Sequence, residues 1–173
     1  MGERTRPVHN EYPMTEMETA VRPANPDDVP AMARLLTAAN LPPFPVGDHW
    51  DTFWLLEGDD GAVGMIGLEV YGPSALLRSV VVDESLRGKG LGDLLTQKAL
   101  SEARSRGVRN VFLFTMDRAP FFARYGFAVC TMDDFDQEGR KSSQYLALVE
   151  RPDIAAMLTP MRLVMSPDHG DRC

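Results

Sequence analysis

Hydrophobic positions change their spacing along the chain, and these changes mark helices and strands. Asn25 followed by Pro26 is a typical helix start, and apolar residues recur after it at helical spacing, so we predict a helix from Pro26 to Ala39. From Trp50 onward, short apolar runs alternate with Gly and Asp turns, which is typical of an antiparallel meander. The predicted strands are Thr19 to Arg22, Thr52 to Glu57, Ala62 to Val70 and Ala75 to Val82.

The second half of the chain alternates between a long helical period and short apolar runs. The spacing predicts a helix from about Gly90 to Arg106, with Gly107 as a left-handed C-cap, and then a strand from Val111 to Thr115. Because a helix joins this strand to the previous one, we expect the two strands to be parallel. The remaining predicted elements are a short helix from Ala119 to Tyr125, a strand from about Phe127 to Met132 and a last strand within Thr159 to Met165.

These elements describe one α/β (α+β) domain. The chain has 173 residues, 44% hydrophobic and 25% charged, which are ordinary values for a single globular core. Apolar periodicity is missing at both ends, so we predict a mobile leader over residues 1–17, a single domain over 18–165 and a loose tail over 166–173. The proline-rich segment 41–49 is either a loop or a broken helix, and such segments often lie over a site.

Net charge and hydropathy argue against two classes of partner. A formal charge of −7 disfavours the broad basic surface that nucleic acid requires. No run approaches the roughly 18 apolar residues that span a bilayer, and residues 1–12 lack the hydrophobic segment of a signal peptide. We therefore expect a cytoplasmic protein that binds neither nucleic acid nor membrane.

Cysteine and histidine are too few and too scattered to indicate a metal site. Cys130 and Cys173 have no metal-ligand spacing, and two of the three histidines lie in the predicted ends, so we expect reduced thiols and no metal. Phe44, Trp50 and Trp54 suit either the core or an interface, which leaves a homodimer open.

A glycine-rich loop joins the predicted strand Ala75 to Val82 to the following helix. Its residues are Arg87, Gly88, Lys89, Gly90, Leu91 and Gly92. Alternate glycines leave backbone N–H groups uncovered, and a helix N-terminus adds partial positive charge, so the loop can bind pyrophosphate without a basic surface. A plain tight turn is the structural alternative.

Two better-known phosphate loops do not match this spacing. In a Walker A loop Ser or Thr follows the Lys, whereas Gly90 follows Lys89 here. A dinucleotide-binding loop has the spacing G-x-G-x-x-G, whereas Gly88, Gly90 and Gly92 have the spacing G-x-G-x-G.

A family resemblance covers about Val63 to Val129. The run LRSVVVD, Leu77 to Asp83, followed by R-x-x-G-x-G over Arg87 to Gly92, resembles the acetyl-CoA signature of the GNAT superfamily of N-acyltransferases. Downstream, VFLFT from Val111 and FFARYGF from Phe121 are similar to the pattern of the same superfamily, in the same order.

The resemblance implies a fold and a mechanism. It implies a mixed sheet, with an antiparallel meander plus a splayed parallel strand pair and helices on both faces. Acetyl-CoA would be the co-substrate, with its pyrophosphate on the amides of Gly88 to Gly92 and its pantetheine along Val80, Val81 and Val82. The thioester would lie between the splayed strands, where a neutral amine attacks it directly and the backbone N–H near Val80 stabilises the oxyanion.

One position departs from the family pattern. Many members carry a tyrosine four residues before the Gly-Phe pair, where its hydroxyl protonates the departing CoA thiolate. Here that position is Phe122, which we still expect to contact the cofactor. Tyr125 points elsewhere on the helix and is favoured as a core or rim residue over a catalytic acid.

The acceptor is indicated by a narrower resemblance. Leu77-Arg78-Ser79, with Leu113-Phe114-Thr115 and Phe121-Phe122, resembles the acetyltransferase domains of N-acetylglutamate synthases and arsenic-resistance-type N-acetyltransferases, which act on α-amino acids or their analogues. Arg78, in an otherwise apolar strand, would bind the acceptor carboxylate, with Ser79 beside it. The alternative for Arg78 is an internal salt bridge, for example with Glu69.

Other roles remain open from the sequence. Glu69 either takes the amine proton through water or only holds Arg78. Ser142 to Tyr145 begin either a cover of the acceptor pocket or a plain surface helix. The leading prediction is a small-molecule N-acetyltransferase, and the alternatives are a protein N-terminus or lysine acetyltransferase and a non-catalytic CoA-binding module.

Overall fold

The computed structural model describes residues 21–41 and 50–167. The predicted leader, the start of the first strand, most of the proline-rich segment, Phe44 and residues 168–173 lie outside these ranges. Within them, no helix is long and apolar enough to cross a membrane.

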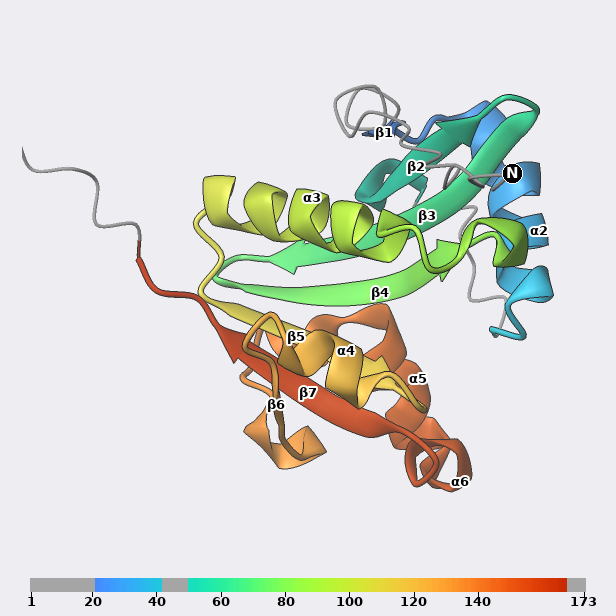
Figure 1. Ribbon diagram of the computed structural model, residues 1–173. Helices are drawn as coiled ribbons and strands as arrows, with labels where there is room; N and C mark the ends of the chain where they lie inside the picture. Colours follow the sequence, from blue (N-terminus) through green and yellow to red (C-terminus); the bar gives the residue numbers. More distant parts are fainter. Residues whose placement is uncertain (1–20, 42–49, 168–173) are drawn as a thin grey trace, which may run out of the picture.

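In the described ranges, a mixed sheet of seven strands forms the centre of the domain, in the order β1-β2-β3-β4-β5-β7-β6 (Figure 1). Its strands are β1 (Val21–Pro23), β2 (Phe53–Gly58), β3 (Gly61–Tyr71), β4 (Ser74–Val82), β5 (Asn110–Thr115), β6 (Ala128–Val129) and β7 (Thr159–Val164). Strands β1 to β4 form the predicted antiparallel meander, and β4 and β5 form the predicted parallel pair.

Helices pack on both faces of the sheet, as predicted. They are α2 (Val29–Ala38), α3 (Leu91–Ser105), α4 (Ala119–Ala123), α5 (Ser143–Glu150) and α6 (Pro152–Ala155), with short 3-10 turns between them. Asn25 caps the 3-10 turn Pro26–Asp28 that leads into α2, and Gly107 ends α3 with a φ of 73°. The predicted end before Gly107 is therefore confirmed to within a residue or two, whereas the helix predicted from Pro26 opens as a 3-10 turn and becomes α-helical at Val29.

Opposite pleats of the same strands build separate cores. On one face, α3 and α4 cover Ile66, Leu68 and Leu77, together with Trp54. On the other face, α2 covers Met65 and its neighbours, while Leu76 of β4 packs with Phe112 and Phe135 beneath α5. Trp54 is thus a core residue. The sheet is the middle layer between the two groups of helices visible in Figure 1.

Strands β4 and β5 separate after a short ladder. Their pairing ends at Leu76 opposite Phe112, so the rest of β4 has no partner strand on its β5 side among the described residues. Ser79 has a φ of 54°, and the β3–β4 register shifts there, with Gly67 opposite Arg78 but Met65 opposite Val81. This bulge bends β4 and opens the predicted V between the two strands.

Two predictions about the second half need correction. The strand predicted from Phe127 to Met132 is only Ala128–Val129 long, because Thr131 caps the 3-10 turn Met132–Asp134 and turns the chain away from the sheet. The helix predicted from Ala119 to Tyr125 ends at Ala123. The segment that follows β6 contains α5 and α6. Phe135, stacked on Phe112 with ring centroids 4.2 Å apart, holds this segment against the sheet.

Candidate active site

The glycine-rich loop leaves β4 and starts α3. Asp83 closes the strand by accepting a hydrogen bond from the Ser85 amide at 3.0 Å. Gly88 and Gly90 both have a φ of 79°, in the left-handed region, and a Cβ added at either would meet nothing within 4 Å. Glycine is required at these two positions by backbone conformation, and not by lack of space.

The amides of this loop are available to a ligand. For Gly88 to Asp93, the described part of the chain contains no backbone or side-chain acceptor for the N–H groups. Gly90 is the N-cap of α3 and provides no side-chain cap, so the positive end of the helix is open. Arg87 and Lys89 are exposed, and Arg87 Nε donates to the Val82 carbonyl at 3.3 Å. The arrangement suits an anion such as pyrophosphate.

The end of β4 offers an unpaired strand edge beside this loop. Val81 and Val82 pair with Met65 and Gly64 on the β3 side. On the β5 side the ladder has already ended, which leaves the edge of Val80 to Val82 open to an extended ligand. A cavity of about 230 Å³ adjoins the same strand end, and its lining includes Val81, Val82 and Arg87.

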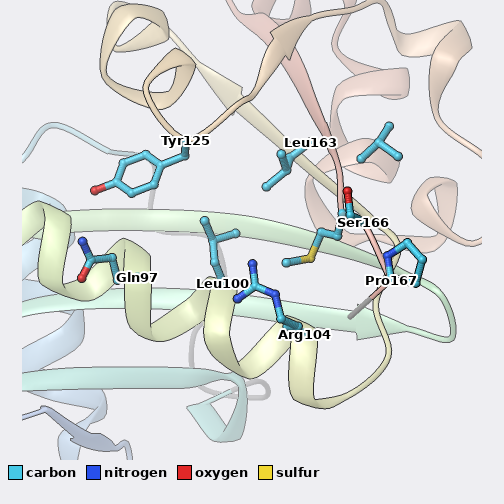
Figure 2. A pocket seen from close by; sticks show the side chains of 9 residues that line it. Gln97, Leu100, Arg104, Tyr125, Leu163, Ser166 and Pro167 are labelled. Carbon is cyan, nitrogen blue, oxygen red and sulfur yellow. The ribbon is translucent and has the colours of Figure 1, made fainter. Parts of the chain in front are cut away.

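A larger groove lies elsewhere on the molecule. Figure 2 shows this groove, of about 740 Å³, between α3 and the end of β7, where Gln97, Leu100 and Arg104 face Tyr125 and Leu163. None of the predicted site residues lines it. The smaller cavity at the strand end therefore has the stronger connection to the predicted chemistry.

Arg78 and Glu69 form a buried ion pair in the middle of the sheet. Arg78 Nη1 lies 3.1 Å from Glu69 Oε2, and the two side chains are only 1% and 3% exposed. Arg78 also directs Nε toward the Ser79 hydroxyl at 3.4 Å and stacks over the Phe53 ring at 5.4 Å. The salt bridge foreseen as an alternative is therefore present, and it places a fixed cation at the bend of β4.

The Glu69 carboxylate accepts a hydrogen bond from each of four donors. These are Tyr71 Oη at 2.7 Å, Ser143 N at 3.1 Å, Ser143 Oγ at 2.6 Å and Arg78 Nη1 at 3.1 Å. Burial raises the pKa of Glu69. The hydrogen bonds from Ser143 and Tyr71 and the charge of Arg78 together lower it by more than burial raises it, so the pKa lies below its ordinary value of 4.5. This geometry favours Glu69 as the group that holds Arg78. Its role as a base stays a prediction.

The position of the missing tyrosine is part of the core. Phe122 is buried and meets Phe121 and Phe127 edge to face, with ring centroids 5.1 Å and 5.9 Å apart. The Tyr125 hydroxyl donates instead to the Asp93 carboxylate on α3. Burial and this hydrogen bond raise the pKa of Tyr125 above its ordinary value of 10. Tyr125 is therefore better placed to join the turn after α4 to α3 than to protonate a thiolate.

The sequence does not single out Tyr71, and it places Ser143 only within the segment Ser142 to Tyr145, as either a pocket cover or a surface helix. Ser143 reaches Glu69 from 74 positions along the chain, and the local sequence carries no signal of this contact. Tyr71 follows Glu69 at the alternate-residue spacing of one strand face, which could have suggested it.

Comparisons with known proteins find relatives of one enzyme family. A family model described as an acetyltransferase (GNAT) domain matches residues 49–129. An amino-acid acetyltransferase of Mycobacterium tuberculosis is 32% identical over 119 residues, which are 62% of this chain and 67% of the relative. The crystal structure of Rv2747 from Mycobacterium tuberculosis in complex with CoA and NLQ has a TM-score of 0.72 at 27% identity and covers 84% of this chain and 99% of that one.

A more distant structure shares the fold. N-acetylglutamate synthase from Neisseria gonorrhoeae, complexed with coenzyme A and N-acetyl-glutamate, matches with a TM-score of 0.70 at 19% identity. The match covers 84% of this chain and 35% of the synthase chain, so the likeness concerns one part of a longer protein.

Proposed function

Because the chain belongs to the GNAT family of acetyltransferases, we propose that it transfers the acetyl group of acetyl-CoA to the amine of a small carboxylate-bearing acceptor, an amino acid or an amino-acid analogue. Family membership makes the protein an acyltransferase with acetyl-CoA as its co-substrate. The acceptor class is the new part of the proposal.

The donor half of the reaction uses backbone groups. The amides of Gly88 to Gly92 hold the pyrophosphate at the start of α3, and pantetheine lies along the open edge of Val80 to Val82. Arg87 and Lys89 add charge from the solvent side, where it is worth little. Phe122 supports the cofactor side of α4 from within the core.

Buried Arg78 is the observation that carries the acceptor proposal. A guanidinium at 1% exposure is expensive unless anions meet it, and it sits directly before the bulge at Ser79, where β4 and β5 part. Its planar fork suits an α-carboxylate, so it would fix the acceptor with its amine directed at the thioester. Glu69 holds the guanidinium in place.

The reaction is a direct transfer. The neutral amine nitrogen forms a bond to the thioester carbonyl carbon, and the backbone N–H of Val80 stabilises the oxyanion. The C–S bond then breaks, and CoA leaves as a thiolate. Since Phe122 has no acidic proton, we assign protonation of the thiolate and removal of the amine proton to water; a thiolate is a good leaving group.

The test is release of free CoA with a panel of amino acids, each paired with its uncharged amide. The proposal predicts that kcat/KM favours the acids, and that Arg78→Lys removes most of this preference because an ammonium lacks the planar fork. Titration calorimetry with CoA should give the same dissociation constant for both proteins. The variant keeps a charge opposite Glu69, so it is expected to fold.

Equal turnover of acids and amides by the wild-type protein would refute the acceptor proposal. Turnover of peptides in place of amino acids would favour the protein-acetylating alternative. Loss of CoA binding in Arg78→Lys would show instead that the change reaches the donor side.

A further inference from the structure

The hydroxyl of Ser143 lies between the two buried charges. Its Oγ accepts a hydrogen bond from Arg78 Nη1 at 2.9 Å and donates one to Glu69 Oε2 at 2.6 Å. The backbone amide of the same residue donates to Glu69 Oε1 at 3.1 Å. A single residue of α5 thus contacts both members of an ion pair that belongs to β3 and β4.

The position of Ser143 is fixed from outside the pair. The preceding residue, Ser142, is fully buried and donates its hydroxyl to the Gly139 carbonyl at 2.8 Å. Two residues further on, Tyr145 packs on Phe135 with ring centroids 5.1 Å apart. The start of α5 is therefore held on both sides of Ser143, and the hydroxyl has little freedom to move away from Arg78.

Ser143 also shares the charge of Glu69 among several donors. Its amide is the first of α5, where the helix dipole favours a negative group, and Tyr71 Oη supplies a further bond. Because neutral donors carry part of the stabilisation of Glu69, Arg78 retains more of its attraction for a second carboxylate. A pair kept only for stability would not need this arrangement, since apolar residues of similar volume often serve as well.

We propose that Ser143 is a positioning residue that holds the Arg78 guanidinium in the orientation required by the acceptor carboxylate, and so contributes to acceptor specificity. The inference rests on the proposed function. It makes the N-terminus of α5 part of the acceptor site, although α5 lies far along the chain from the donor loop.

The experiment compares Ser143→Ala, Ser143→Thr and Ser142→Ala. Ser142→Ala is the matched control, because it removes an adjacent buried hydroxyl that bonds Gly139 and not the ion pair. Each variant is assayed for KM and kcat with the best amino acid and with its amide, and for CoA affinity by calorimetry. We expect Ser143→Ala to raise KM for the acid about tenfold or more, as loss of hydrogen bonds to charged groups does, with KM for the amide and the CoA dissociation constant unchanged.

The controls decide between positioning and general packing. Ser143→Thr keeps the hydroxyl and should restore most of the affinity for the acid, while Ser142→Ala should leave the ratio of the two KM values as in the wild type. If Ser143→Ala raises both KM values alike, weakens CoA binding, or is matched by Ser142→Ala, the positioning role is wrong while the acceptor proposal stands. If the wild-type protein itself does not prefer acids, both the acceptor proposal and the positioning role of Ser143 are wrong.

Discussion

The proposed donor and acceptor sides of the site are built in opposite ways. The donor side is an exposed loop in which Gly88 and Gly90 present backbone amides, and it takes all its parts from one continuous segment. The acceptor side is a buried cluster in which Glu69, Arg78 and Ser143 come from three separate elements. A donor common to a whole family can be bound by backbone alone, whereas selection among acceptors requires side chains that differ from member to member.

The buried side should be the more fragile of the two. Arg78→Ala is expected to lower the free energy of unfolding by about 3 to 5 kcal/mol, because it leaves the Glu69 charge buried without its cation. Denaturant unfolding at pH 7 measures this loss. The double variant Glu69→Gln/Arg78→Met removes both charges at similar volume and should recover most of the stability. A double variant as unstable as the single one would show that the pair is not the source of the loss.

In the exposed donor loop, substitution of a glycine should act through backbone strain. Gly90→Ala forces a side chain into a φ of 79° and should cost about 1 to 2 kcal/mol of unfolding free energy. Gly107→Ala, at the other end of α3 with a φ of 73° and equally open space, should cost the same. Only Gly90→Ala should weaken CoA binding in a calorimetric titration.

Comparing Gly90→Ala with Gly107→Ala separates an effect of the loop on CoA binding from an effect of destabilising α3. Equal weakening of CoA binding by both alanine variants would mean that α3 as a whole, and not the loop, governs the donor site. Unchanged binding in both would contradict the assignment of the pyrophosphate to the loop amides.

The contact between α3 and the turn that follows α4 should contribute less to stability. Tyr125→Phe removes the bond to Asp93, which still accepts from Arg124 Nη2 at 2.9 Å, so the expected loss is about 0.5 to 1.5 kcal/mol. We expect kcat to stay the same, because the pKa of Tyr125 is raised and its hydroxyl already donates a hydrogen bond to the Asp93 carboxylate. A decrease in kcat of about a hundredfold or more would instead identify Tyr125 as the general acid.

The same contrast explains what the sequence could predict. The donor loop, the meander and the parallel pair follow from local patterns, so their residues could be named in advance. The salt bridge of Arg78 was foreseeable as one of two roles, because Glu69 lies on the neighbouring strand. For Ser143, the sequence offered a pocket cover or a surface helix but not the contact with this ion pair. That contact depends on how Phe135 and Tyr145 place α5 on the sheet, and no local period encodes that placement.

A pH titration gives the smallest effect and tests the charge sharing directly. The folded pKa of Glu69 lies below its ordinary value of 4.5, so its carboxylate contributes stability at neutral pH that is lost as the pH falls through 4.5 toward the folded value. Urea unfolding between pH 7 and pH 3 should therefore show a steeper acid loss for the wild-type protein than for Glu69→Gln/Arg78→Met. All other carboxylates are the same in both proteins, so their contribution cancels in the difference between the two unfolding curves.

The same pH titration of Ser143→Ala tests whether the Ser143 hydroxyl lowers the pKa of Glu69. It leaves Tyr71 and Arg78 facing Glu69 but removes the hydroxyl bond, so the pKa of Glu69 should rise and the acid loss should begin at a higher pH than in the wild type. Ser142→Ala should leave the curve unchanged in shape. If the curve for Ser143→Ala matches the wild-type curve, the Ser143 hydroxyl does not share the charge of Glu69, and the remaining donors, Tyr71, the Ser143 amide and Arg78, determine the ionisation of the buried carboxylate.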